Sequence, residues 1–186
     1  MSSLLSNPAA DDRRARVAAA AITAFSRHGY RRCTMGDIAA AAGMSRPALY
    51  LLFCGKEEVF RAVAESLLAD AAIAAELAWP ADADPVEGLA AAILAKDLPI
   101  QRLCHASPHA EEILAVAASL TADLHQASTA RFEALLARRL AEAGRADAPG
   151  LARMLVNAAA GLKHAGLPEA DYIADVGRLA QLIGEK

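Results

Sequence analysis

Hydrophobic residues recur at helical spacing along most of this chain of 186 residues, and no segment has the strict alternation of a half-buried strand. The spacing predicts helices over the following ranges: 11–28, 35–42, 46–54, 56–79, 86–96, 109–143, 150–165 and 169–184. Leu98 and Pro99 are expected to end the fifth range, and the pattern leaves open whether the sixth is interrupted. Residues 1–10 are expected to form a flexible arm.

Helix-capping residues support the first boundaries. Asp11 suits the positive end of a helix dipole, and Gly29 is a good stop signal. Thr34 and Asp37 form a capping-box pattern, in which a threonine caps a helix and an acid follows three residues later. Ser45 is expected to cap the next helix, with Pro47 in its first turn. Gly43 stands where the chain must turn sharply, and a positive φ is expected there.

Composition agrees with an all-α protein. Hydrophobic residues make up 55% of the chain but aromatic residues only 4%, and alanine, the best helix former, supplies much of the apolar count. The longest uncharged apolar runs, such as 17–26 and 113–122, are about half a membrane span, and the N-terminus lacks a signal-peptide pattern. We therefore expect a cytoplasmic protein that has no membrane partner. Three widely spaced cysteines, Cys33, Cys54 and Cys104, are expected to be reduced thiols.

Charge is distributed unevenly along the chain. Residues 1–66 hold nine lysines and arginines against six acids, whereas residues 67–186 hold ten against sixteen. A basic N-terminal module on an acidic body is the pattern expected of a phosphate-binding head, although this asymmetry is mild.

Residues 34–53 have the pattern of a helix-turn-helix: two short helices joined by a tight turn at Gly43, with alanines where the helices must cross closely. The second helix begins with the polar residues Ser45 and Arg46. In this motif that end enters the major groove of DNA, where each base pair presents a distinct set of donors and acceptors.

At these residues the chain closely resembles the TetR/AcrR family of helix-turn-helix transcriptional regulators. The resemblance covers roughly residues 14–65 and rests on these positions: Phe25, Gly29, Thr34, Ile38, Ala39, Ala42, Gly43, Ser45, Leu49, Tyr50, Phe53, Lys56 and Glu57. It implies a three-helix DNA-binding domain over residues 1–57 and a helical ligand-binding and dimerisation domain over 58–186. Leu52 departs from the family pattern, because a histidine or tyrosine that contacts phosphate is usual there; Cys54 also replaces the usual Pro or Lys.

The resemblance also implies DNA-binding roles for Thr34, Ser45, Arg46, Pro47, Ala48, Tyr50 and Lys56. Thr34, Tyr50 and Lys56 would contact phosphates, Arg46 would contact a guanine, and Ala48 a thymine methyl. Three alternatives stay open: Tyr50 could be a packed side chain with a wet hydroxyl, Lys56 could be an ordinary solvated lysine, and the arginines at 13, 14, 16, 31 and 32 could be plain surface. Ile38, Leu49, Phe53 and Phe25 are expected in the core.

The C-terminal part carries two further predictions. A two-fold dimer is expected to pack through its last two helices, with these interface residues: Leu151, Met154, Leu155, Ala158, Leu162, Ile173, Val176, Leu179, Ala180 and Ile183. An apolar ligand pocket is expected among residues 86–143, with Trp79, Leu103, His105, Ile113, Val116 and Leu120 as candidate lining residues. Trp79 could equally cover a gap between domains, and Ile113, Val116 and Leu120 could be plain core.

No catalytic, cofactor-binding or metal-binding motif is recognisable, and Pro108 keeps His105 and His109 from sharing one helix face. The protein is therefore expected not to be an enzyme and to need no cofactor or metal. The leading hypothesis is a homodimeric repressor that binds a palindromic operator in double-stranded DNA and is released by a small apolar effector. The alternatives are a DNA-binding regulator without a ligand and an all-α binding protein or enzyme with an incidental helix-turn-helix. The sequence names neither the effector, the operator nor the regulated genes, and it does not separate repressor from activator.

Overall fold

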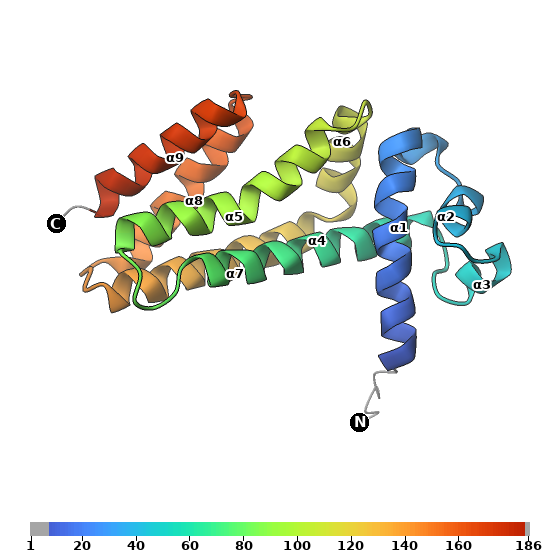
Figure 1. The fold of residues 1–186 in the computed structure, drawn as a ribbon, viewed down its shortest axis with the longest axis horizontal. Coiled ribbons are helices and arrows are strands. Elements are labelled where there is room, and N and C mark those ends of the chain that lie inside the picture. Colours follow the sequence, from blue (N-terminus) through green and yellow to red (C-terminus); the bar gives the residue numbers. More distant parts are fainter. Residues whose placement is uncertain (1–7, 185–186) are drawn as a thin grey trace. The chain divides into compact units, whose positions relative to one another are not determined.

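The structure, a computed structural model, describes residues 8–184, with side chains from Ala10 to Leu182. This part of the chain forms nine α-helices and no strand, which confirms the all-α prediction (Figure 1). Residues 1–7 of the expected arm and the side chain of Ile183 lie outside the described residues. The helices form two compact units. Unit 1 holds the described residues up to Leu67 together with Arg102–Leu124, and unit 2 holds Leu68–Gln101 and the described residues from His125 onward.

Unit 1 contains α1 (Pro8–Arg32), α2 (Met35–Ala41), α3 (Arg46–Tyr50) and α6 (Ala110–Leu120). It also contains the first part of α4 (Lys56–Ala78) and the end of α5 (Pro85–His105). Gly29 has a φ of 72° and interrupts the helical backbone of α1 at the predicted stop, but α1 extends beyond it to Arg32. Helix α1 also begins at Pro8, so residues 8–10 of the predicted arm are helical. The packing units divide the chain at other places than residue 57. A DNA-binding domain that ends at residue 57 therefore stays a prediction.

The core of unit 1 is built from the hydrophobic faces of its N-terminal helices. Phe25, Ile38, Leu49 and Phe53 are all buried, as the sequence predicts. Phe25 packs edge-on against Phe60 with ring centroids 5.4 Å apart. On α6, the partly buried side chains that pack against this core are Ile113, Val116, Ala117 and Leu120. The helix-turn-helix therefore stands on a core to which α6 contributes.

Unit 2 contains the rest of α4 and α5 together with α7 (Ala122–Glu142) from His125 onward, α8 (Ala148–His164) and α9 (Glu169–Gly184). Its core holds large side chains from α5, α7, α8 and α9, among them Ile93, Leu136, Leu155 and Val176, and the small Ala75 from α4. Trp79 is 2% exposed and lies so close to Gly88 that a Cβ there would collide with the indole ring. Gly88 thus permits the close approach of α5 to the tryptophan.

A carboxylate is buried inside unit 2. Asp97 on α5 is only 3% exposed. It accepts hydrogen bonds from the Tyr172 hydroxyl at 2.8 Å, from Lys96 Nζ at 3.0 Å and from Lys163 Nζ at 3.2 Å. Burial raises the pKa of Asp97, but the two ammonium groups and the tyrosine hydroxyl together hold it below its ordinary value. This network joins α5 to α8 and α9.

Two helix boundaries beyond α4 differ markedly from the sequence predictions. Helix α5 does not end before Pro99 but continues through it to His105, because Leu94 and Leu98 extend its apolar face onto the core and Pro99 itself is exposed. The predicted stretch 109–143 is interrupted at Thr121, which is fully buried and whose hydroxyl donates to the Ala117 carbonyl at 2.7 Å. The break separates α6 from α7.

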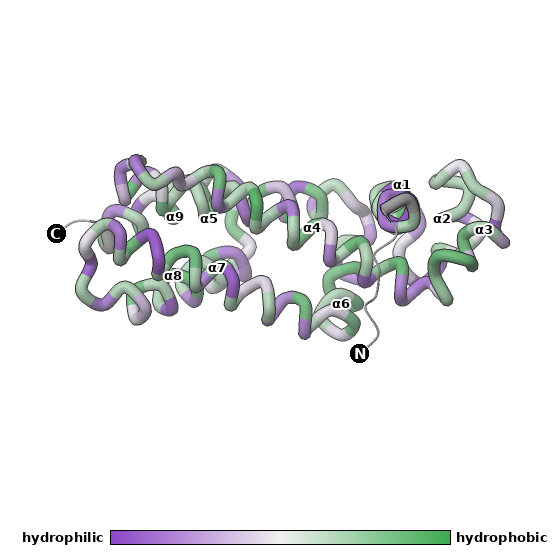
Figure 2. Tube along the Cα trace, turned by 90° about the horizontal axis from the view of Figure 1, so that it is seen from below, coloured by the Kyte–Doolittle hydropathy of each residue, from purple (hydrophilic) through white to green (hydrophobic). Residues whose placement is uncertain are grey.

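Hydrophilic segments interrupt the hydrophobic ones along the helices, as the alternating colours of Figure 2 show for α4 and α7. None of the helices in the described part combines the length and apolar character that a bilayer crossing requires.

Candidate nucleic-acid interface

The capping box that begins α2 is formed as the sequence predicts. The Thr34 hydroxyl accepts the Asp37 backbone N–H at 3.2 Å, and the Asp37 carboxylate accepts the Thr34 backbone N–H at 2.8 Å and its hydroxyl at 2.7 Å. These bonds from Thr34 lower the pKa of Asp37. The exposed Thr34 hydroxyl is therefore already oriented by α2, and its predicted phosphate contact stays a prediction.

The turn and the second cap set the direction of α3. Gly43 has a φ of 64°, the left-handed conformation that was expected there. Ser45 is the N-cap of α3, and its hydroxyl accepts the Ala48 backbone N–H at 3.3 Å. Leu49 is fully buried beneath the helix. The predicted helix over 46–54 is shorter than expected, because it ends at Tyr50 with Leu51 as its C-cap.

The opposite face of α3 carries the predicted base-reading residues. Ser45, Arg46 and Pro47 are exposed, and Ala48 is partly buried. Tyr50 is 45% exposed, and the Arg46 guanidinium lies 5.7 Å from the centre of its ring. The two side chains share one face one turn apart, so this short helix presents a cation, an aromatic ring and a hydroxyl together.

Leu51 was not among the predicted site residues. Its side chain is 88% exposed. Sequence periodicity offers a weak signal for it, since Leu49 and Phe53 take the buried positions around it and leave Leu51 on the polar side. It extends the exposed face of α3 by one apolar side chain.

Lys56 has a different environment from the one expected. Its ammonium donates to the backbone carbonyls of Tyr30 at 2.7 Å, Cys33 at 3.0 Å and Arg31 at 3.2 Å. It also lies 4.4 Å from the centre of the Tyr30 ring. Because an ammonium has three N–H donors, these carbonyls at the end of α1 account for all of them. The alternative of a merely solvated lysine is wrong, and a phosphate contact would require Lys56 to give up one of these bonds.

Arg14 holds the segment between α3 and α4. Its guanidinium donates to Glu58 at 2.9 Å and to the Leu52 carbonyl, and it lies 4.1 Å from the centre of the Phe53 ring. Glu58 also accepts the Cys54 backbone N–H at 2.7 Å. That backbone bond and the bond from Arg14 lower the pKa of Glu58. Of the five arginines whose role was left open, Arg14 is a structural residue, and sequence spacing gave no signal for its partners.

The predicted dimer residues do not share one environment. Leu155, Val176 and Ala180 are completely buried in the core of unit 2 within a single chain, so they cannot lie at an interface between chains, and the prediction is wrong for these three. Leu151, Leu162 and Leu179 are partly buried against the same core, and Ala158 is partly buried. Met154 and Ile173 are exposed by 61% and 37%. The error arises because α8 and α9 have two apolar sides, of which one packs inward.

The six predicted ligand-binding residues fall into different units. Trp79 is buried in unit 2, whereas Leu103, His105, Ile113, Val116 and Leu120 belong to unit 1. Trp79 packs against Gly88 and is almost completely buried. Among the described residues, no three or more His, Cys, Asp or Glu side chains are grouped so that they could hold a metal ion.

Comparison with known proteins places residues 17–63 in the sequence model of the bacterial regulatory proteins, tetR family. A curated relative, the uncharacterized HTH-type transcriptional regulator YfiR of Bacillus subtilis (strain 168), is 41% identical over 56 residues. That match spans 30% of this chain and 27% of the relative. Residues 17–63 contain most of α1, all of α2 and α3, and the start of α4.

Solved structures extend the likeness to the whole fold. A transcriptional regulator from Rhodococcus sp. Rha1 superposes with a TM-score of 0.71 at 21% identity, covering 91% of this chain and 95% of that chain. SmeT, the repressor of the Stenotrophomonas maltophilia multidrug efflux pump SmeDEF, superposes with a TM-score of 0.63 at 26% identity, covering 91% and 85%. The helix-turn-helix segment therefore matches the tetR family of bacterial regulatory proteins, and the fold of the described residues resembles that of solved transcriptional regulators.

Proposed function

We propose that this protein is a transcriptional repressor that binds a palindromic operator in double-stranded DNA and is released from it by a small molecule. The observation that carries the proposal is the exposed face of α3, where Ser45, Arg46 and Tyr50 stand above the buried Leu49. A polar helix end supported by a rigid core is the form in which helix-turn-helix proteins present side chains to the major groove. The proposed place of action is the cytoplasm.

Each exposed side chain has a role that its chemistry suits. The planar guanidinium of Arg46 matches the two acceptors that guanine presents in the major groove, and Tyr50 beside it restricts the conformations of the arginine. Ala48 offers a methyl group for contact with a thymine methyl, and Ser45 and Pro47 border the same edge. The hydroxyls of Thr34 and Tyr50 would donate to backbone phosphates, which position the protein without reading sequence.

A palindromic operator requires a two-fold dimer. The side chains available for it are Met154 on α8 and Ile173 on α9, together with the partly buried Leu151, Ala158, Leu162 and Leu179. Leu182, which is 80% exposed on α9, is added to the predicted set. An exposed methionine and leucine on adjacent helices would be unfavourable in water and favourable between two chains.

Release by a small molecule is the finer part of the proposal. A structure described as the SmeT–triclosan complex shares this fold with a TM-score of 0.63 at 23% identity. For this chain, we propose that a ligand binds better to the conformation in which the two recognition helices are splayed apart. Only this difference in affinity can release DNA. By thermodynamic linkage, bound DNA must weaken the binding of the ligand by the same factor. The alternative is a DNA-binding regulator that no small molecule controls.

Selection from a pool of random double-stranded DNA tests the DNA-binding proposal. The full chain should enrich an inverted repeat whose half-sites are centred about 34–36 Å apart, or a multiple of that spacing. Binding of the enriched sequence should weaken steeply as salt is raised, because phosphate contacts release counterions. Recovery of unrelated sequences without a repeat would favour an all-α binding protein with an incidental helix-turn-helix.

A further inference from the structure

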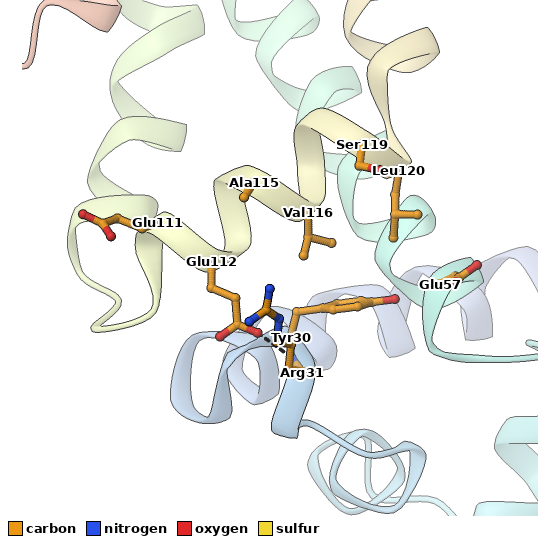
Figure 3. Close-up of a pocket in the computed structure, with 9 residues that line it drawn as sticks. All are labelled: Tyr30, Arg31, Glu57, Glu111, Glu112, Ala115, Val116, Ser119 and Leu120. Atoms are coloured by element: carbon orange, nitrogen blue, oxygen red, sulfur yellow. Dashed lines mark hydrogen bonds between the residues drawn. The ribbon is translucent and has the colours of Figure 1, made fainter.

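A cavity of about 560 Å³ opens in unit 1 beside the end of α1, the first turn of α4 and α6 (Figure 3). Every residue that lines it belongs to this one unit. Its volume lies within the range of about 300–1,000 Å³ that is usual for small-molecule sites. Val116 and Leu120, two of the six predicted ligand-binding residues, are in its wall, and the other four are not.

The wall of this cavity combines an apolar side with negative charge. Val116 and Leu120 of α6 and the ring of Tyr30 supply the apolar surface (Figure 3). The charged lining residues are Glu57, Glu111, Glu112 and Arg31, so three carboxylates stand against one guanidinium. Burial and the nearby charge of Glu57 raise the pKa of Tyr30, so its hydroxyl stays neutral and adds no further negative charge to the wall. A ligand that satisfies this wall has an apolar body and a positive charge.

Glu112 connects the cavity to the helix-turn-helix. Its carboxylate accepts the Arg31 backbone N–H at 2.6 Å, as Figure 3 shows. Arg31 lies in the short segment between Gly29 and Thr34 whose carbonyls accept the bonds from Lys56, and Thr34 is the N-cap of α2. The same residue therefore forms part of the cavity wall and holds the segment that leads into α2.

We propose that this cavity is a binding site for a small amphiphilic cation, such as an amine on an apolar body. The apolar body packs against Val116 and Leu120, and the ammonium lies in the field of Glu57 and Glu112. A ligand that contacts Glu112 competes with its bond to the Arg31 N–H and so changes the support of α2. This inference deepens the proposed ligand response, and it rests on the proposed function only for its effect on DNA.

Three probes separate the contribution of ligand charge from that of the apolar body, which they share: phenylbutylamine, phenylbutanol and phenylbutyrate. The isotopically labelled full chain is titrated with each probe in the absence of DNA and followed by NMR. Phenylbutylamine should shift the backbone amide signal of Arg31. The alcohol should bind more weakly and the carboxylate should not bind, because the lining carries net negative charge. Added salt should weaken the binding of the amine but not that of the alcohol. Equal binding of the three probes, or shifts confined to residues of unit 2, would overturn the proposal.

A matched pair of variants tests the charge. Glu57→Gln removes a carboxylate from the cavity, and Glu87→Gln makes the same change in the first turn of α5 in unit 2. Affinity for phenylbutylamine should fall about threefold in the first variant, as expected for one solvent-exposed charge contact, and stay unchanged in the control. If both variants bind phenylbutylamine with equal affinity, the proposal that the ligand binds in this cavity is contradicted.

The effect on DNA is measured separately with the selected operator. Saturating phenylbutylamine should weaken operator binding by about fivefold or more, the lower end of usual couplings between sites. If the amine binds at Arg31 and operator affinity does not change, the coupling is wrong while the DNA-binding function stands. If no DNA is selected but the amine still shifts the Arg31 amide, the proposed function fails and the binding site stands.

Discussion

The guanidinium of Arg46 lies 5.7 Å from the centre of the Tyr50 ring, one turn further along α3. This pairing places a charged group that can read guanine next to a ring that limits its movement. Leu49 between them is fully buried and fixes the helix to the core of unit 1. The orientation of both side chains is therefore set by the fold, and binding DNA need order little more than the side-chain ends.

Replacing Arg46 should affect affinity and specificity together. In Arg46→Ala, the loss of a bidentate guanine contact should weaken operator binding by about 1–3 kcal/mol and relax the preference at one base pair of each half-site. Fluorescence anisotropy titrations with operators changed at single positions measure both effects. Arg131→Ala, an exposed arginine of α7 in unit 2, is the control and should bind like the unaltered protein. Unchanged affinity of Arg46→Ala would mean that the recognition helix is misplaced.

Replacing Lys56 distinguishes between two roles of this lysine, a structural role and a contact with a DNA phosphate. Lys56→Ala should weaken binding to all DNA sequences alike under either role. A phosphate contact would also lower the salt slope by about one unit. Because the Lys56 ammonium is already bound to three carbonyls, we expect an unchanged slope.

The same variant should lower the free energy of unfolding by about 1.5 kcal/mol, the lower end for hydrogen bonds from a charged group, since the ammonium is partly exposed. Urea denaturation measures this loss. A lowered salt slope with unchanged stability would show that the lysine serves phosphate instead.

Asp97 should make the stability of the protein depend on pH. Burial raises its pKa, but Lys96, Lys163 and the Tyr172 hydroxyl lower it further, so the folded pKa lies below the unfolded value of about 4. The stabilisation from the ionised carboxylate is therefore present above about pH 4 and is lost as the pH falls through the folded pKa.

Asp97→Asn should cost about 3 kcal/mol at neutral pH, because it leaves two ammonium groups without their carboxylate while they keep some contact with water. Urea denaturation at neutral pH and near pH 3 should show a deficit that shrinks in acid. Asp82→Asn, in an exposed loop, is the control. A deficit of equal size at both pH values would contradict the role of charge in this network.

The dimer proposal is tested at Met154. It is 61% exposed on α8, and burial of a carboxylate at an apolar interface is strongly unfavourable. Met154→Glu should raise the dimer dissociation constant by about tenfold or more, measured by light scattering over a range of concentrations. Leu77→Glu, at an apolar position on α4 that is 75% exposed, should leave assembly unchanged. Loss of the dimer in the control alone would move the interface to α4.

The sequence predicted those parts of the site that depend on local rules. Thr34, Gly43 and Ser45 act through residues within a few positions of themselves, so caps and the turn could be read directly. Lys56 and Arg14 could not be interpreted this way, because their partners lie 23 to 44 positions away in the sequence. The direction of a long charged side chain is decided by tertiary packing.

Packing also explains the errors in the C-terminal part. Periodicity identifies an apolar face on α8 and α9 but does not say whether another helix of the chain or a second chain covers it. Leu155 and Val176 turned out to face inward. Pro99 was taken as a helix end from its local chemistry, whereas the apolar contacts of Leu98 keep α5 helical beyond it.

Helix α3 is proposed to enter the major groove of DNA with Arg46 at a guanine. Interference by methylation at guanine N7, which blocks that groove, tests it most directly on the selected operator. Methylation of one guanine in each half-site should abolish binding of the unaltered protein and should have little further effect on Arg46→Ala. If only methylation at adenine N3 in the minor groove interferes, or if both proteins respond alike at every guanine, the claim is wrong.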